Sequence, residues 1–111
     1  MFNPEMMKKY SEVGMKVQEL QSELSQTEVE CATKDSGVVV KVTGTQVPLS
    51  VTVSDELCGQ GVDAVSTELT NALKQAHAKS GAYAQNKMRD LYEEMGLSAG
   101  MAGLGDKPPG Q

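Results

Sequence analysis

The chain has 111 residues and a formal net charge of −5, from 10 basic and 15 acidic side chains. This acidic balance excludes nucleic-acid binding through bulk charge, so any such binding needs a local basic surface. One domain is expected, and its core must be modest because aromatic residues are 4% of the chain and seven methionines serve as filler. No run of ~18 apolar residues occurs, so no membrane insertion is expected.

The first expected element is a long helix from Asn3-Pro4-Glu5 to about Gln26. Asn is a good N-cap, Pro suits the first helical position, and an early Glu favours the positive end of the helix dipole. Its apolar residues recur at gaps of four and three, which gives a narrow coiled-coil seam. The seam consists of Met6, Tyr10, Val13, Val17, Leu20 and Leu24. Because little else in so short a chain could cover it, a second copy is expected to do so.

Three strands are expected in the middle of the chain. Residues 27–32 alternate weakly, residues 38–43 hold four valines and are the strongest strand signal, and residues 49–53 alternate after Pro48. The connections are short, which predicts an antiparallel meander. One face of this sheet is apolar and needs a cover.

A second long helix is expected over residues 62–95, ending at Gly96 as a C-terminal cap. It would cover the sheet with one face, made of Val65, Leu69, Leu73, Ala76, Ser80, Ala84, Met88, Leu91 and Met95. The remaining residues, 97–111, are rich in Gly and Pro and are interpreted as a flexible tail. The expected organisation is therefore a domain of residues 1–96 followed by a tail of residues 97–111.

No constellation for catalysis, metal binding or cofactor binding is recognisable. His77 is the only histidine and is interpreted as a helix-surface residue. Adjacent carboxylates diverge on a helix, and no glycine-rich segment has the setting of a phosphate loop. Cys31 and Cys58 are interpreted as free thiols, with a redox-sensitive pair left open. The chain is therefore expected not to be an enzyme.

The second helix carries an unusual charge pattern. Between Glu68 and Asp90 there is no acidic residue, and the basic residues there are Lys74, Lys79, Lys87 and Arg89. Such a run is a candidate anion-binding surface. The alternative is an ordinary solvated helix, because these four side chains point in different directions at ~100° per residue. Lys8, Lys9 and Lys16 of the first helix could add to the surface.

The ordered set of features resembles the YbaB/EbfC family of nucleoid-associated proteins over roughly residues 6–96. The segment from Ser36 to Pro48 carries most of the resemblance, with a Gly before a Val-Lys-Val strand and then the Gly-x-Gln-x-Pro hairpin of cyanobacterial and plastid members. Asn86-Lys87-Met88 near a late Leu also fits. Many bacterial members have Arg after the hairpin, where this chain has Pro48-Leu49-Ser50.

The resemblance implies an α+β fold of order α-β-β-β-α, with a three-stranded antiparallel sheet and two long helices in a tweezer-like homodimer. It implies a nucleoid-associated protein that binds double-stranded DNA in the cytoplasm and nucleoid. Phosphate contacts without base readout would come from Lys8, Lys9, Lys16, Lys74, Lys79, Lys87 and Arg89. The alternative is a protein-interaction adaptor for ribosomes or targeting factors, as in plastid relatives, located in the chloroplast stroma.

Overall fold

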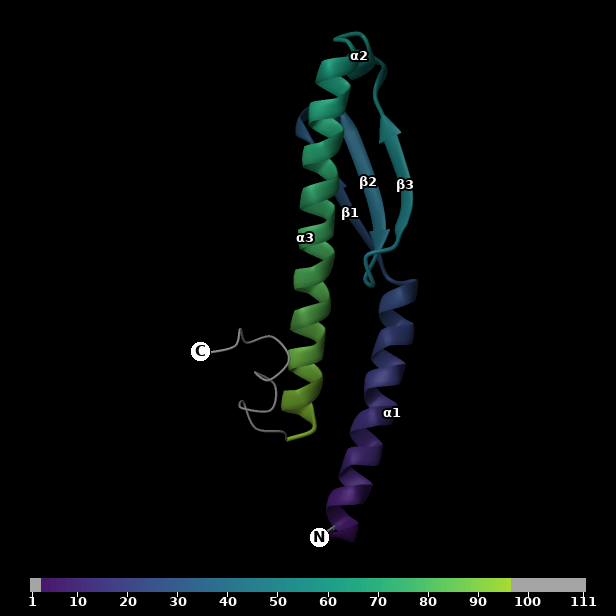
Figure 1. Ribbon diagram of the computed structural model, residues 1–111, viewed down its shortest axis with the longest axis vertical. Helices are drawn as coiled ribbons and strands as arrows, with labels where there is room; N and C mark the ends of the chain where they lie inside the picture. The colour runs from purple at the N-terminus through teal and green to yellow at the C-terminus, as the bar shows by residue number, and fades with distance from the viewer. Residues whose placement is uncertain (1–2, 97–111) are drawn as a thin grey trace. The chain divides into compact units, whose positions relative to one another are not determined.

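The computed structural model describes residues 3–96 and has the expected α+β order (Figure 1). The predicted tail lies outside these residues. The elements are α1 (Pro4–Gln26), β1 (Glu28–Ala32), a 3-10 turn (Lys34–Ser36), β2 (Val38–Thr43), β3 (Pro48–Val53), α2 (Asp55–Cys58) and α3 (Val62–Glu94). Contacts divide the chain into two compact units. We call residues 24–84 the sheet unit, and residues up to 23 together with those from 85 onward the helical unit.

Helix α1 begins and ends as its sequence predicts. Asn3 caps its first turn, because the Asn3 Oδ1 atom accepts a hydrogen bond from the Glu5 backbone N–H at 2.8 Å. At the other end, the backbone N–H of Gly44 donates to the carbonyls of Leu24 at 2.9 Å and Thr27 at 3.0 Å. The β2–β3 hairpin thus satisfies carbonyls that the helix end leaves open.

Only glycine fits at position 44. A Cβ there would lie 2.8 Å from the Leu24 carbonyl oxygen and 3.2 Å from the Leu24 Cα atom. Both are backbone atoms that cannot move aside alone. The first glycine of the hairpin motif is therefore required by the close approach of α1.

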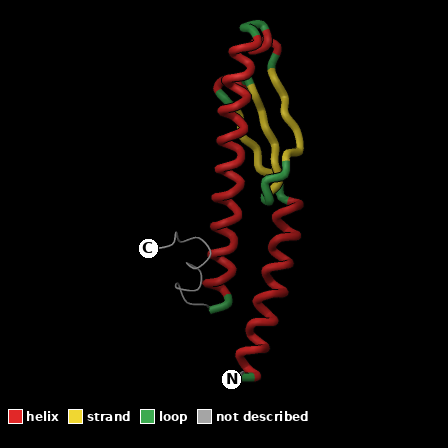
Figure 2. The backbone as a smooth tube through the Cα atoms, in the orientation of Figure 1, coloured by secondary structure: helices red, strands yellow, loops and turns green. Residues whose placement is uncertain are grey.

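The three strands form the predicted antiparallel meander in the order β1-β2-β3 (Figure 2). Cys31 pairs with Val40, and Val40 pairs with Val51, so these three side chains share one face of the sheet. A register irregularity lies at Lys41/Val42. Strand β3 is the edge strand beside β2.

Helix α3 covers β1 and β2 closely because its facing side chains are small. Val38 and Val40 are fully buried, as are Ala72 and Ala76 of α3. The hydroxyl of Ser80, also fully buried, donates to the Thr43 carbonyl at 2.7 Å. The four apolar side chains belong to one hydrophobic core of the sheet unit, which also contains Val29, Val42 and Leu57.

Two details of this region differ from the sequence prediction. Leu73 was expected to face the sheet, yet it is 41% exposed, and Ala72 takes the buried place. The close approach of α3 favours the small residue, and Leu73 lies ~100° further around the helix. The short helix α2 was also not predicted; the Ser54 side chain caps it by accepting the Leu57 N–H at 3.1 Å.

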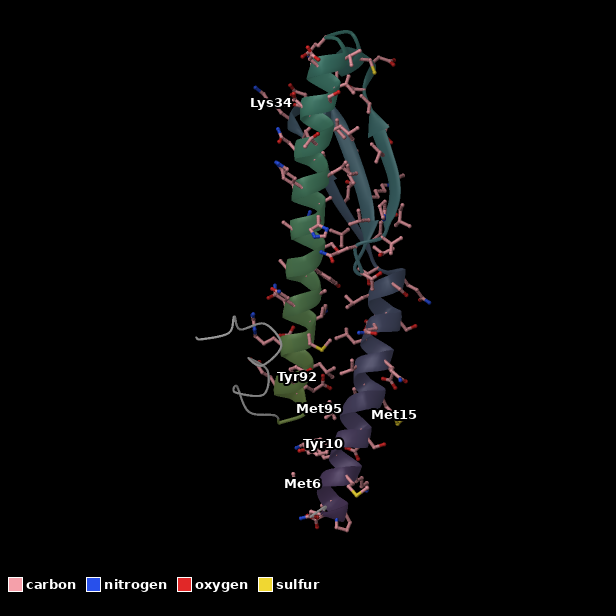
Figure 3. All side chains as sticks on the ribbon, in the orientation of Figure 1. Met6, Tyr10, Met15, Lys34, Tyr92 and Met95 are labelled. Atoms are coloured by element: carbon pink, nitrogen blue, oxygen red, sulfur yellow. The ribbon has the colours of Figure 1, made fainter. Side chains whose placement is uncertain are left out.

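The apolar seam of α1 is covered in part by the chain itself, and its cover by a second copy stays a prediction. Leu20 and Leu24 are 8% and 4% exposed, whereas Met6 and Tyr10 remain about half exposed. In the helical unit, Leu20 lines one pocket with the buried Leu91 of α3. In Figure 3, Met6 and Tyr10 lie on the α3 side of α1 and Met15 points away.

Candidate nucleic-acid interface

The seven predicted DNA-contacting residues divide between the two units. Lys74 and Lys79 belong to the sheet unit. The other five belong to the helical unit: Lys8, Lys9, Lys16, Lys87 and Arg89. All seven are exposed.

In the sheet unit, Lys79 and Lys74 have different surroundings. The Lys79 ammonium donates to the backbone carbonyl of Glu30 at 2.7 Å, so this side chain ties α3 to the middle of β1. Lys74 lies five residues earlier, which places it ~140° away around the helix. The two lysines therefore do not share one face, as the solvated-helix alternative expects.

In the helical unit, Lys16 of α1 and Lys87 of α3 line the same pocket of about 280 Å³. The sequence patterns did not predict that these two lysines share a pocket. Four carboxylates and two leucines complete the lining: Glu19, Glu23, Asp90, Glu94, Leu20 and Leu91. We call these eight residues the α1–α3 pocket.

The α1–α3 pocket holds two positive charges and four negative ones, so it is not a basic surface. The ammonium of Lys16 lies 3.7 Å from a carboxylate oxygen of Glu19, one turn away on α1. Both side chains are more than half exposed, so water and salt screen this pair.

A signal for this pocket exists in the sequence. The segments Lys16-Val-Gln-Glu19-Leu20-Gln-Ser-Glu23 and Lys87-Met-Arg-Asp90-Leu91-Tyr-Glu-Glu94 share the pattern Lys-x-x-acid-Leu-x-x-Glu. On a helix, residues at these spacings lie on neighbouring faces of two turns. All four shared positions of both copies line the pocket.

The remaining basic residues of the helical unit, Lys8, Lys9 and Arg89, do not line the α1–α3 pocket. Arg89 donates one guanidinium hydrogen bond, from Nη1 to the Asn86 Oδ1 atom at 3.2 Å, and its other donors can reach an anion. Lys9 places its Nζ atom 3.8 Å from where a Cβ on Gly96 would lie. Lys8 is one residue away on the exposed α1 surface.

The hairpin motif that carries the family resemblance has a structural task. Gln46 adopts a positive φ of 68°, and its side-chain amide donates to the His77 carbonyl at 3.1 Å. That amide nitrogen would lie 3.1 Å from a Cβ on Gly81. The motif thus fastens the hairpin to α3, and His77 is exposed on the helix as predicted.

A second pocket, of about 680 Å³, lies in the sheet unit and is acidic. One lysine, Lys34, lines this pocket with the carboxylates of Asp35, Glu56 and Glu68. Their excess of negative charge disfavours the binding of phosphate. Within residues 3–96, no three His, Cys, Asp or Glu side chains are grouped to hold a metal ion. No helix in the same range is long and apolar enough to cross a bilayer.

The two cysteines are free thiols, as interpreted from the sequence. The Cys31 thiol donates to the Gln75 side-chain oxygen at 3.5 Å, and Cys58 is exposed. Cys31 faces α3 from β1, so its environment is that of a small apolar side chain with a weak donor.

Comparisons with known proteins agree with this architecture. The chain is 32% identical over 100 residues to a nucleoid-associated protein of Prochlorococcus marinus strain MIT 9515, which covers 90% of this chain and 84% of that protein. It is 37% identical over 87 residues to one of Nostoc sp. strain PCC 7120, covering 78% and 76%.

A solved structure supports the fold alone. An uncharacterised protein of Helicobacter pylori matches with a TM-score of 0.72 and 14% sequence identity, covering 82% of this chain and 97% of that one. The model of the YbaB/EbfC DNA-binding family matches residues 1–95. This is a family of nucleoid-associated DNA-binding proteins and not of enzymes. The chain therefore belongs to the YbaB/EbfC DNA-binding family.

Proposed function

We propose that this family member acts as a homodimer that holds duplex DNA through phosphate contacts, with little sequence preference, in the nucleoid. The observation that carries the proposal is the absence of acidic residues between Glu68 and Asp90 on α3, in a chain with excess negative charge. This segment of α3 has no acidic side chains of its own, so it repels phosphate less than the rest of the protein does.

Not all seven candidate residues are equally suited to bind phosphate. Lys8, Lys9, Lys74 and Arg89 are the principal contacts in this proposal. Lys79 has a carbonyl partner at Glu30, and Lys16 and Lys87 line an acidic pocket. These three would need to exchange protein partners for phosphate, which lowers their net gain.

The test of DNA binding is fluorescence anisotropy with a labelled ~30-base-pair duplex across a salt series. We expect log affinity to fall linearly with log salt, with a slope of about −0.9 for each phosphate neutralised. Lys8→Glu/Lys9→Glu and Lys74→Glu should each lower the affinity and flatten the slope. Lys34→Glu is the matched control, because it lies among acidic neighbours and should change the slope little.

Two outcomes would contradict the contact assignment. One is an equal loss of affinity for Lys34→Glu and Lys74→Glu, which would indicate a net-charge effect. The other is a strong preference between two duplexes of equal length and unrelated sequence, which phosphate contacts cannot produce without shape readout.

The proposed homodimer has a surface for its second copy in the sheet unit. Val51 of β3 is 44% exposed and pairs with Val40, so it lies on the face that α3 covers over the other strands. Leu49, at the register irregularity of the same strand, is 53% exposed. Leu73 of α3 is similarly exposed. Strand β3 also has an unpaired edge within the described sheet. An exposed edge strand with apolar side chains is a surface that proteins normally cover.

Light scattering tests the second copy at this surface. The wild type should be dimeric at about 10 µM, a concentration at which micromolar or tighter dimers form. Leu49→Lys/Val51→Lys should shift it to monomer with little loss of helix signal, since both side chains are already exposed. Met15→Lys, on the face of α1 that points away from α3, is the control and should remain dimeric. A monomeric wild type would contradict the dimer.

A second function, the protein-interaction adaptor, is favoured by one face of α1. A sector about 120° wide carries no charge along the helix, although the neighbouring sector is almost entirely charged. Its exposed residues in the helical unit are Met7, Ser11, Gly14, Met15, Gln18, Gln21 and Ser22. Depletion of charge with exposed Met is typical of protein–protein contact surfaces.

A pull-down with and without nuclease separates the adaptor from the DNA binder. Partners retained after nuclease treatment and lost in Met15→Lys would support the adaptor, including ribosomal or targeting partners. If every partner is lost after nuclease treatment, the partners were bound through DNA, and the adaptor is contradicted.

A further inference from the structure

The α1–α3 pocket sets two basic residues against twice as many carboxylates. Lys16 and Lys87 are the lysines, and the pocket of about 280 Å³ between them has no other cationic lining residue. Its local charge is therefore −2, from two lysines and four carboxylates. A phosphate approaching either ammonium meets acidic side chains at the same opening.

The arrangement repeats on the two helices. Each supplies a lysine, an acidic residue three positions later, a leucine beside it and a glutamate seven positions after the lysine. The two leucines, Leu20 and Leu91, are 8% and 9% exposed and line the same pocket as the charged groups. Burial of these apolar side chains favours keeping the acidic groups near the lysines, in addition to the Lys16–Glu19 ion pair.

We propose that Glu19, Glu23, Asp90 and Glu94 withhold Lys16 and Lys87 from DNA, so that the α1–α3 pocket is an autoinhibitory contact. This autoinhibitory proposal rests on the proposed function, because it concerns the same binding of DNA phosphates. A carboxylate oxygen of Glu19 already lies 3.7 Å from the Lys16 ammonium, and Asp90 and Glu94 line the same pocket as Lys87. DNA binding at these lysines requires displacing acidic side chains that leucine packing keeps close.

Neutralising the four carboxylates of the pocket should make both lysines available to DNA. Glu19→Gln/Glu23→Gln/Asp90→Asn/Glu94→Gln keeps the size and helical tendency of these side chains and releases both lysines. At ~50 mM salt, the affinity for a ~30-base-pair duplex should rise about threefold to tenfold, and two added phosphate contacts should steepen the log–log salt slope by up to ~1.8.

A matched control removes the same charge elsewhere. Asp35→Asn/Asp55→Asn/Glu56→Gln/Asp63→Asn changes the net charge from −5 to −1, as the pocket variant does. None of these four residues lines the α1–α3 pocket. A general weakening of repulsion would affect both variants alike and would leave the number of phosphate contacts unchanged.

The decisive step is a mutant cycle with Lys16→Gln/Lys87→Gln, because the cycle isolates the coupling between the acidic and basic groups. In the wild-type background this pair should change DNA affinity less than twofold, because the lysines are already withheld. In the background of the quadruple pocket variant, Glu19→Gln/Glu23→Gln/Asp90→Asn/Glu94→Gln, the same lysine substitutions should abolish the gain in DNA affinity. Circular dichroism measures the helix content of each variant and so checks that it folds. If the quadruple variant unfolds, the double variant Glu19→Gln/Glu23→Gln takes its place.

The outcomes separate the two proposals. A lysine-dependent gain supports the autoinhibitory contact, including the case in which only the pocket variant binds. Wild-type binding without a gain, or with a gain equal to that of the matched control, overturns the contact and leaves DNA binding intact. Absence of binding by every variant overturns both.

Discussion

In the sheet unit, Val38, Val40, Ala72 and Ala76 have no exposed surface, and the buried Ser80 hydroxyl has a carbonyl partner at 2.7 Å. The helical unit retains 8–9% exposure at its two most buried side chains, Leu20 and Leu91, and its Lys16–Glu19 ion pair is largely solvated. Buried apolar area dominates stability, and exposed ion pairs add little. We therefore expect the sheet unit to be the more resistant of the two to local opening.

The largest effect should come from the close contact inside the sheet unit. Gly44→Ala would force a Cβ to within 2.8 Å of the Leu24 carbonyl oxygen, and we expect a loss of about 2–4 kcal/mol in unfolding free energy. The measurement is denaturant unfolding followed by circular dichroism.

Gly14→Ala is the matched control on α1. A Cβ there meets nothing within 4 Å, so helix propensity should make this variant about 0.5–1 kcal/mol more stable. Equal effects at the two glycines would contradict the close approach of α1 to the hairpin.

Core truncation should sharpen the difference between the units. Val40→Ala should lower the global unfolding free energy by about 2–3 kcal/mol, since it removes two methyl groups from a fully buried site. Leu91→Ala should act mainly by opening the helical unit. Hydrogen exchange distinguishes them: Leu91→Ala should speed exchange in residues 7–23 while the β2 amides stay protected.

That expectation fails if Leu91→Ala accelerates exchange equally in α1 and β2. The two units would then unfold as one cooperative body, despite the different depths of their cores.

A smaller effect should follow from removing the buried hydroxyl. Ser80→Ala leaves the Thr43 carbonyl without its side-chain donor and should cost about 1–2 kcal/mol in unfolding free energy. Ser11→Ala, on the exposed surface of α1, should change stability by less than about 0.5 kcal/mol. A Ser80 variant as stable as the Ser11 variant would show that the hydrogen bond contributes nothing net.

The smallest effect is expected at the exposed contact between α3 and β1. Lys79→Met keeps the aliphatic stem but removes the donor to the Glu30 carbonyl, so unfolding free energy should fall by about 0.5 kcal/mol. Lys74→Met should leave stability unchanged within error. Thermal melts in parallel measure both, and a larger loss at Lys74 would reverse the roles we assign.

Local periodicity was sufficient to predict most of the fold. The bounds of α1 and β2 match, β3 begins at Pro48, and α3 ends before Gly96, whose positive φ of 73° suits its role after the helix. These features depend on capping, alternation and turn chemistry within a few residues. Helix α2 was missed because four residues carry no periodicity.

Packing choices were not accessible in the same way. Leu73 and Ala72 are neighbours, and only the distance between α3 and the sheet decides that the smaller one is buried. The residues that pack against the α1 seam were likewise not predictable, because the spacing of apolar residues does not show whether they belong to the same chain or to a second copy. The basic run on α3 was visible, but the carboxylates that α1 adds beside Lys87 required the tertiary structure.

The amide of Gly44 has a consequence for how this chain can vary in length. Surface hairpins usually tolerate inserted or deleted residues. Here the turn must place one N–H group against the carbonyls of Leu24 and Thr27, so a residue inserted within the paired strands β1 and β2 would move that amide off the helix end. The two strands therefore work as a fixed-length spacer, and we expect insertions in them to be tolerated less than insertions in the loop of residues 33–37 that joins them.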